Sequence, residues 1–401
     1  MYRRRRIAVA SLLALVLGLG FYLPYTLLAP VHAASAQLAP WQAPAVSAPA
    51  VAFPGYGASG LGAVGYPGVL ARAGATTALP IASLTKIVTA LVVLSVKPLS
   101  GTDPGPNLTF GPIDRQFYAD QLAQNGVVEP VYDGEQMPQR TVMTVMLMAS
   151  ANNYADSLAN WAFGSKAAFA AAAQAWLAKQ GLATTTIIDP TGIDPSNAST
   201  ITDLVELAKL AIADPVISKI VATTSIDVPA VGTVTNRNEL LGIDGINGIK
   251  TGTLDQAGAC LMFSATVTIG NTPITLVGAV LGGPDHPTID AAVRTLIEQA
   301  TAGFHEVSLV KAGESFASYS TPWGDAAQAV AASSASLVLW QNTPVTATVR
   351  AGPVKLAASG TAVGDVTFNA GEHHTTVPLV LSNPISDPGA WWRLTHPGRM
   401  S

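Results

Sequence analysis

The stretch that decides the fold is PIASLTKIVTALVVL, residues 80–94. After its first turn, apolar residues recur with the spacing of a helix at Ile87, Val88, Leu91 and Val92. We therefore predict a helix from Ser83 to about Val96 with one buried face. Ser83 lies at its start and Lys86 three residues on, almost one turn away, so both side chains share a face.

Ser83 and Lys86 could serve as a nucleophile and its base. A serine hydroxyl is a weak nucleophile until a base takes its proton. Lys86 can be that base only when neutral, so its pKa must fall from ~10.4 toward ~7–8 through burial or a nearby cation. Backbone N–H groups at a helix start also suit a developing oxyanion. An ordinary N-cap serine beside a solvated lysine is the competing interpretation.

A second motif is Ser150-Ala151-Asn152, within VMLMASANNYADSLANW, residues 145–161. It joins two helical patterns, which predicts a loop. If that loop is extended, the two-residue spacing points both side chains the same way. The hydroxyl can then relay a proton and the carboxamide can bind a peptide backbone. A pair of helix-capping residues is the competing interpretation.

The third motif is Lys250-Thr251-Gly252-Thr253, within GINGIKTGTLDQAGACL, residues 245–261. Glycine allows a ligand or a second segment to approach the backbone closely. A lysine and hydroxyls at one strand edge suit a terminal carboxylate. The alternative is a solvated lysine in a turn of glycine and threonine.

Together, in this order, the motifs match the signature of penicillin-binding proteins and β-lactamases. The flanking sequences DPTGID (189–194), STITDL (199–204) and GIDGINGIKTGT (242–253) extend the match. Over residues of about 55–302 the chain resembles the low-molecular-mass D-alanyl-D-alanine carboxypeptidases, serine peptidase family S11. The resemblance implies an α/β (α+β) fold of the DD-peptidase/β-lactamase-like type. Such a fold has a mainly antiparallel sheet flanked by helices, an all-helical subdomain, and an active site between them.

The resemblance also assigns roles. It implies that Ser83 is the acylated nucleophile, that Lys86 is its base, and that Ser150 relays the proton toward the leaving D-alanine. Backbone N–H groups of Ser83 and Thr253 would form the oxyanion hole. The substrate-binding residues are Asn152, Lys250, Thr251, Gly252 and Thr253.

Two positions depart from the family pattern. Asn153 stands where aspartate is common, and Thr253 stands where some members have histidine. These departures bear on substrate preference and rate rather than on the reaction class.

The N-terminus predicts export. Four arginines, Arg3 to Arg6, precede an uncharged stretch from Ile7 to Val31. Positive charge before an apolar run keeps the N-terminus inside, and the run is long enough to span a bilayer of ~30 Å. We expect residues 1–32 to be a membrane anchor. Small residues from Ala33 onward leave a cleaved signal peptide as the alternative.

Composition divides the rest of the chain. Residues 33–54 form an Ala/Pro-rich stretch, expected to be an extended linker. Residues 55–302 form the expected peptidase domain, and residues 303–401 a small β-rich domain. Further predicted helices are Lys166–Gln180, Thr202–Ala213 with Thr202 as N-cap, and Thr288–Ala300. The main predicted strands are Cys260–Ile269 and Thr272–Leu281, joined as a hairpin at Asn271.

Other ligands are not indicated. Lys and Arg total 21 against 25 Asp and Glu, without a long basic stretch beyond the first six residues, which argues against nucleic acid as a partner. The single cysteine, Cys260, lies in an apolar run and is typical of a buried small hydrophobe. No cofactor or metal site is predicted. The aromatic stretch Trp391–Pro397 is expected to be a domain edge rather than a contact with membrane or partner.

The sequence thus predicts an exported serine-type D-Ala-D-Ala carboxypeptidase. Its substrate would be the peptidoglycan stem peptide, and β-lactams would be covalent inhibitors. A β-lactamase is one alternative, although residues 184–195 lack the glutamate that class A enzymes use for deacylation. A DD-endopeptidase or transpeptidase shares the same acyl-enzyme. A catalytically silent wall-binding protein is disfavoured by the intact motifs.

Overall fold

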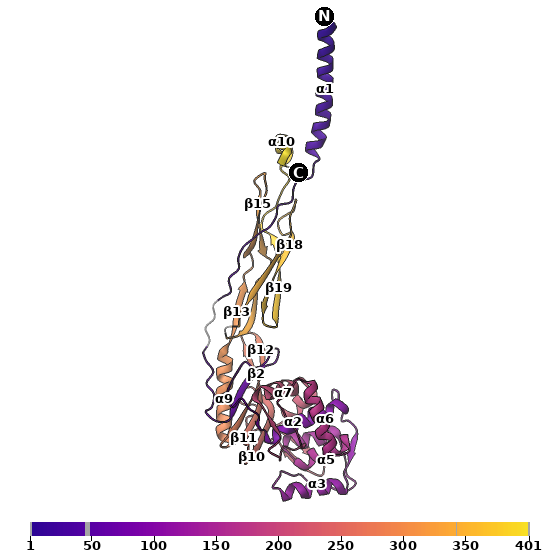
Figure 1. Cartoon of the computed structure of the whole chain (residues 1–401), viewed down its shortest axis with the longest axis vertical. Helices are drawn as coiled ribbons and strands as arrows, with labels where there is room; N and C mark the ends of the chain where they lie inside the picture. Colours follow the sequence, from indigo (N-terminus) through magenta and orange to yellow (C-terminus); the bar gives the residue numbers. More distant parts are fainter. Residues whose placement is uncertain (1, 45–48, 342, 400–401) are drawn as a thin grey trace. The chain divides into compact units, whose positions relative to one another are not determined.

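The computed structural model describes residues 2–44, 49–341 and 343–399. Contacts divide the chain into two compact units. One is Ala48–His305, and the other combines Met1–Ser47 with Glu306–Ser401. Figure 1 shows helices and a sheet in the first unit and mostly strands in the second.

Within the described residues, a five-stranded antiparallel sheet forms the centre of the first unit. Its order is β10 (Ile246–Leu254), β11 (Gly258–Ile269), β12 (Thr272–Gly283), β2 (Ala58–Ala63) and β3 (Ala71–Gly74). The predicted hairpin at Asn271 is confirmed, because β11 pairs with β12 across Gly270 and Asn271. Gly270 takes a positive φ of 59°, which a tight turn of this kind requires. In this strand order β10 comes first, so it lies at an edge of the sheet.

Helices cover both faces of this sheet. Helix α7 (Ile201–Ala213) packs on β2 and β12, and α9 (His286–Gly303) packs on β11 and β12. Figure 1 shows α7 and α9 on opposite sides of the strands. The close approach of α7 needs a glycine, since a Cβ at Gly60 would lie 2.9 Å from Ile201 Cγ1.

The N-cap predicted for α7 is wrong. The cap is Thr200, whose side chain accepts a hydrogen bond from Asp203 N–H. Thr202 lies inside the helix, and its hydroxyl accepts a hydrogen bond from Arg72. Both residues are threonines, a type favoured at helix N-caps, so residue type alone did not distinguish them.

The helical subdomain lies beside the sheet. It contains α2 (Thr85–Val96), α3 (Pro112–Ala123), α4 (Gln139–Met148), α5 (Asn152–Phe163) and α6 (Lys166–Lys179). Helix α5 contacts each of the other helices of this group and so forms its centre. The predicted helices at 83–96, 166–180 and 288–300 are confirmed to within a few residues.

Short elements complete the first unit. Helix α8 (Pro215–Val221) packs on α4 and β10. The strand pairs are β4 (Leu79–Pro80) with β7 (Ala198–Ser199), β5 (Asn107–Thr109) with β6 (Gln136–Pro138), and β8 (Ser225–Val228) with β9 (Gly232–Thr235).

The second unit contains a six-stranded sheet among the residues described. Its order is β1 (Gln37–Leu38), β14 (Ser315–Ser320), β15 (Ala326–Ala331), β19 (His373–Leu381), β18 (Ala362–Ala370) and β17 (Thr346–Ala351). Strands β13 (Phe304–Val310) and β16 (Ala335–Trp340) pair separately. The predicted fold class, antiparallel sheets with flanking helices and C-terminal strands, is confirmed.

Part of the stretch expected to be a linker belongs to this second sheet. Ala34 pairs with Val354, and β1 pairs with β14. Trp41 packs edge-on against Phe368 at 5.1 Å and donates a hydrogen bond to Leu309 O. These contacts hold residues 34–41 as an edge of the sheet. Residues 45–48 of the expected linker lie outside the described residues.

Both ends of the chain contribute helices to the second unit. Helix α1 (Tyr2–Leu27) is long and apolar enough to cross a membrane, and an 18-residue window within it has a mean hydropathy of 2.2. Helix α10 (Gly389–Thr395) contacts it, because Tyr22 Oη donates to Leu394 O. In the aromatic stretch, Trp392 packs edge-on against Trp323 at 5.7 Å, whereas Trp391 is 79% exposed.

Candidate active site

Ser83 lies in a tight 3₁₀ turn, η1 (Ala82–Leu84), that leads directly into α2. Ala82 in this turn takes a positive φ of 46°, an uncommon conformation for a residue with a Cβ. The edge strand β10 packs directly against the turn. A Cβ at Gly252 would lie 3.1 Å from Ser83 N, so glycine is what lets the third motif approach the first.

Lys86 is fully buried on the first turn of α2. Its Nζ lies 3.0 Å from Ser83 Oγ, 2.7 Å from Asn152 Oδ1 and 2.7 Å from Thr191 O. Burial lowers the pKa of Lys86 to about 7, while the negative charges of Asp189 and Asp156 oppose that shift. The amine is therefore neutral in a large fraction of molecules at neutral pH.

The geometry decides where the lone pair of the neutral amine points. A neutral lysine has two N–H groups and one lone pair. The carbonyl oxygens of Asn152 and Thr191 can only accept, so each takes one N–H. The lone pair is left facing the Ser83 hydroxyl, which is the arrangement that proton removal requires.

The loop that supplies the Thr191 carbonyl is held by one carboxylate. Asp189 accepts hydrogen bonds from the backbone N–H groups of Thr191, Gly192 and Asp194. Burial raises the pKa of the Asp189 carboxyl, but a hydrogen bond from the Thr191 hydroxyl and these backbone hydrogen bonds outweigh burial and lower the pKa overall. Gly192 has a φ of 84°, and a Cβ there would lie 1.9 Å from Ala82 O.

The second motif does not form the extended loop that the spacing suggested. Ser150 is buried with a φ of 63°, in the left-handed region, and Asn152 begins α5. Asn152 N–H donates to Val127 O, which ties the motif to the segment before α4. The side chains consequently separate, with Ser150 lining a cavity and Asn152 bound to Lys86.

Asn153 has a structural role that explains its departure from aspartate. Its Oδ1 accepts from Glu129 N–H at 3.1 Å, and its Nδ2 donates to Glu129 O at 2.9 Å. An ionised carboxylate could make only the first of these bonds, because it has no donor.

Lys250 lies buried in β10, where its Nζ donates to Thr251 O at 3.0 Å. Burial and the nearby positive charges of Lys86 and Arg237 lower the pKa of Lys250 well below its ordinary value. An anion bound at this edge would favour the charged lysine. Thr253 Oγ1 lies 2.8 Å from His286 Nε2 at the start of α9.

A cavity of about 320 Å³ opens in front of Ser83. The predicted site residues that line it are Ser83, Ser150, Thr251, Gly252 and Thr253. Lys86, Asn152 and Lys250 support them from buried positions. In the part of the chain that the structure describes, no group of three or more His, Cys, Asp or Glu side chains could hold a metal ion.

The cavity also includes residues that were not predicted to belong to the site: Val127, Arg237, Glu239, His286 and Asp290. Arg237 could have been suspected, since it is a rare cation shortly before the third motif. Its backbone N–H donates to Met148 O, close to the second motif, and this contact has no local sequence pattern.

Comparisons with known proteins place the chain in a family. The sequence model of the S11 peptidases, described as D-alanyl-D-alanine carboxypeptidase, matches residues 67–284. A D-alanyl-D-alanine endopeptidase of Pseudomonas aeruginosa is 31% identical over 49% of this chain and 62% of its own length. The D-alanyl-D-alanine carboxypeptidase DacA of Escherichia coli is 27% identical over 65% of this chain and 64% of its own. The chain thus spans somewhat less than two thirds of these relatives.

A solved structure supports the fold. The peptidoglycan synthesis regulatory factor PBP3 of Streptococcus pneumoniae superposes with a TM-score of 0.61 at 20% identity, covering 82% of this chain and 99% of that one. The family model alone matches more than half of the residues. The chain therefore belongs to the D-alanyl-D-alanine carboxypeptidase family of peptidases, S11.

Proposed function

We propose that the protein is a serine-type D-alanyl-D-alanine carboxypeptidase that trims peptidoglycan stem peptides through an acyl-enzyme on Ser83. The observation that carries this proposal is the environment of Lys86. Its Nζ lies 3.0 Å from Ser83 Oγ, and two carbonyl oxygens occupy its N–H groups. A neutral amine held in this way can take the proton of the Ser83 hydroxyl.

The proposed reaction proceeds in two halves. Lys86 takes the proton of Ser83 as Oγ attacks the carbonyl carbon of the penultimate D-alanine. Backbone N–H groups of Ser83 and Thr253 stabilise the oxyanion, and Ser150 passes the proton to the departing amine. Water then hydrolyses the acyl-enzyme, and Ser83 regains its proton.

The far end of the cavity is suited to the substrate's terminal carboxylate. Lys250, Thr251 and Thr253 lie on the edge strand, and Gly252 leaves room for the substrate backbone. Arg237 lines the same cavity and adds a positive charge to it. We assign Asn152 the task of binding the acyl side of the substrate.

Endopeptidase activity is the second candidate, and two observations favour it. The P. aeruginosa endopeptidase is 31% identical, against 27% for DacA. Glu239 and Asp290 also line the cavity and add negative charge to it, which disfavours a free carboxylate. The two activities share the acyl-enzyme and differ only in the leaving group.

The proposed location is outside the cytoplasm, with residues 1–32 as a membrane anchor. The length and hydropathy of α1 support it, and a signal sequence has the same properties. The membrane, the stem peptide and β-lactams as covalent inhibitors are the proposed partners.

The nucleophile and base can be tested with fluorescent penicillin. We expect Ser83→Ala to abolish covalent labelling and Lys86→Ala to slow it by ~10²-fold or more, the usual contribution of a positioned proton acceptor. Lys179→Ala, at the exposed end of α6, is the matched control and should label normally. Undiminished labelling of folded Ser83→Ala would rule out this nucleophile.

The leaving group can be tested with a pentapeptide ending in D-Ala-D-Ala and with its C-terminal amide. Losing a charge-assisted hydrogen bond of ~1.5–3 kcal/mol should lower kcat/KM for the amide at least about tenfold. Thr253→Val should reduce the difference in kcat/KM between acid and amide. Thr268→Val, on an exposed part of β11, should leave this difference unchanged. Equal turnover of acid and amide would instead assign the endopeptidase.

The anchor can be tested by fractionation and N-terminal sequencing of the protein from cells. We expect membrane-bound protein that retains residues 7–31, because this uncharged span follows the arginines. A mature N-terminus near Ser35 would show that residues 1–32 are part of a cleaved signal peptide and not an anchor.

A further inference from the structure

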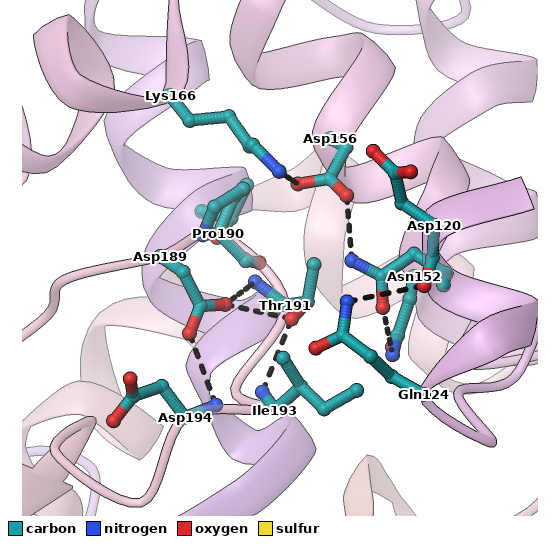
Figure 2. Close-up of polar contacts among 12 residues, drawn as sticks. Asp120, Gln124, Asn152, Asp156, Lys166, Asp189, Pro190, Thr191, Ile193 and Asp194 are labelled. Atoms are coloured by element: carbon teal, nitrogen blue, oxygen red, sulfur yellow. Dashed lines mark hydrogen bonds and ion pairs between the residues drawn. The ribbon is translucent and has the colours of Figure 1, made fainter. Parts of the chain in front are cut away.

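A buried carboxylate lies behind the candidate active site, on the side away from the substrate cavity. Asp156, on α5, has a side chain only 1% exposed. Its Oδ2 accepts a hydrogen bond from Gln121 Nε2 at 2.7 Å, and Lys166 Nζ lies 3.6 Å from its Oδ1. Figure 2 shows Asp156 between Lys166 and the cluster around Asn152.

Side-chain amides connect this carboxylate to the base. Gln121, on α3, accepts at Oε1 from Asn152 Nδ2 at 2.9 Å. Asn152 in turn accepts at Oδ1 from Lys86 Nζ at 2.7 Å. A continuous hydrogen-bond chain therefore runs from Asp156 through Gln121 and Asn152 to Lys86.

An ionised carboxylate fixes the direction of every bond in this chain. It can only accept, so Gln121 must turn its Nε2 toward Asp156 and its Oε1 toward Asn152. Asn152 must then turn Nδ2 toward Gln121, which leaves Oδ1 for Lys86. We propose that Asp156 is a positioning residue whose carboxylate sets this direction and so keeps the lone pair of Lys86 on Ser83. The inference rests on the proposed function.

Protonation of Asp156 would remove the constraint. A protonated carboxyl can donate to Gln121 Oε1, which lets Gln121 turn Nε2 toward Asn152. Asn152 would then present Nδ2 to Lys86. That N–H occupies the lone pair of the neutral amine and blocks proton transfer from Ser83.

The surroundings allow Asp156 to titrate in a useful range. Burial raises the pKa of Asp156 to about 6. The positive charges of Lys166 and Lys86 and the hydrogen bond from Gln121 oppose this rise, and the negative charge of Asp189 adds to it. Lys166 is itself held over the Phe117 ring at 5.2 Å.

Protons have a route to this group. A second cavity, of about 310 Å³, borders Asp156. Its charged lining residues are Asp156, Lys166, Asp189 and Asp194. Asp120, on α3, lies beside the same cluster in Figure 2.

This arrangement predicts an unusual pH dependence of the acylation rate on the acid side. Acylation requires Lys86 without its proton and Asp156 without its proton. Below the Lys86 pKa of about 7 the rate should fall with a slope of one in a plot of log rate against pH. Below the Asp156 pKa of about 6 the slope should become two.

The test is the rate of acylation by fluorescent penicillin across this pH range, in the full-length protein. Asp156→Asn keeps the shape but lets residue 156 donate. We expect it to acylate about tenfold or more slowly at pH ~8, as for a misdirected base, and to keep a slope of one throughout. Asp120→Asn, which removes a carboxylate outside the chain of bonds, should behave as wild type.

A double-mutant cycle separates positioning from packing. Gln121→Met cuts the connection, so adding Asp156→Asn to it should change the rate little. Lys166→Gln removes a nearby cation, so the pKa of Asp156 should rise and the pH at which the slope changes from one to two should rise with it. This variant keeps the inference testable if Asp156→Asn does not fold. An Asp156→Asn variant with the wild-type rate and a slope of two overturns the inference, as does an undiminished effect in the Gln121→Met background. Absence of labelling in the wild type overturns the proposed function itself.

Discussion

The site depends on one buried amine, that of Lys86. A charged ammonium is costly to bury, so burial and the absence of a full ion pair among the described residues favour the neutral form. Ser83, Asn152 and Thr191 then surround the nitrogen at hydrogen-bond distance. These groups come from η1, α5 and the loop around Asp189, so the base depends on how this turn, the helical subdomain and the loop pack together.

Close backbone contacts give this arrangement its rigidity. Gly252 brings the edge strand β10 to Ser83, and Gly192 brings the Thr191 loop to Ala82. Ala82 and Ser150 both hold positive φ angles next to the reacting groups. Residues with a Cβ adopt such angles only where the surrounding structure fixes them. A side chain at either glycine would push its own segment, β10 or the Thr191 loop, away from the turn that carries Ser83 and Lys86.

The sequence predicted the fold class and the residues of the motifs because their spacing and flanks have strong patterns. It did not reveal Thr191 as a partner of Lys86, since a backbone carbonyl carries no side-chain signal. Gln121 and Asp156 were missed for a related reason: their contacts join α3 and α5 and leave no local periodicity. The cap of α7 and the conformation of Ser150 depended on tertiary contacts that propensity does not contain. The two-residue strand β1 is too short to show alternation.

The most direct test of the central claim is the pKa of Lys86 itself. Lysine labelled with ¹³C at Cε reports the protonation state through its chemical shift, and comparison with Lys86→Met assigns the resonance. We expect this resonance to titrate near pH 7. A Lys86 resonance that titrates near its ordinary value of ~10.4 would contradict a neutral base and with it the proposed mechanism.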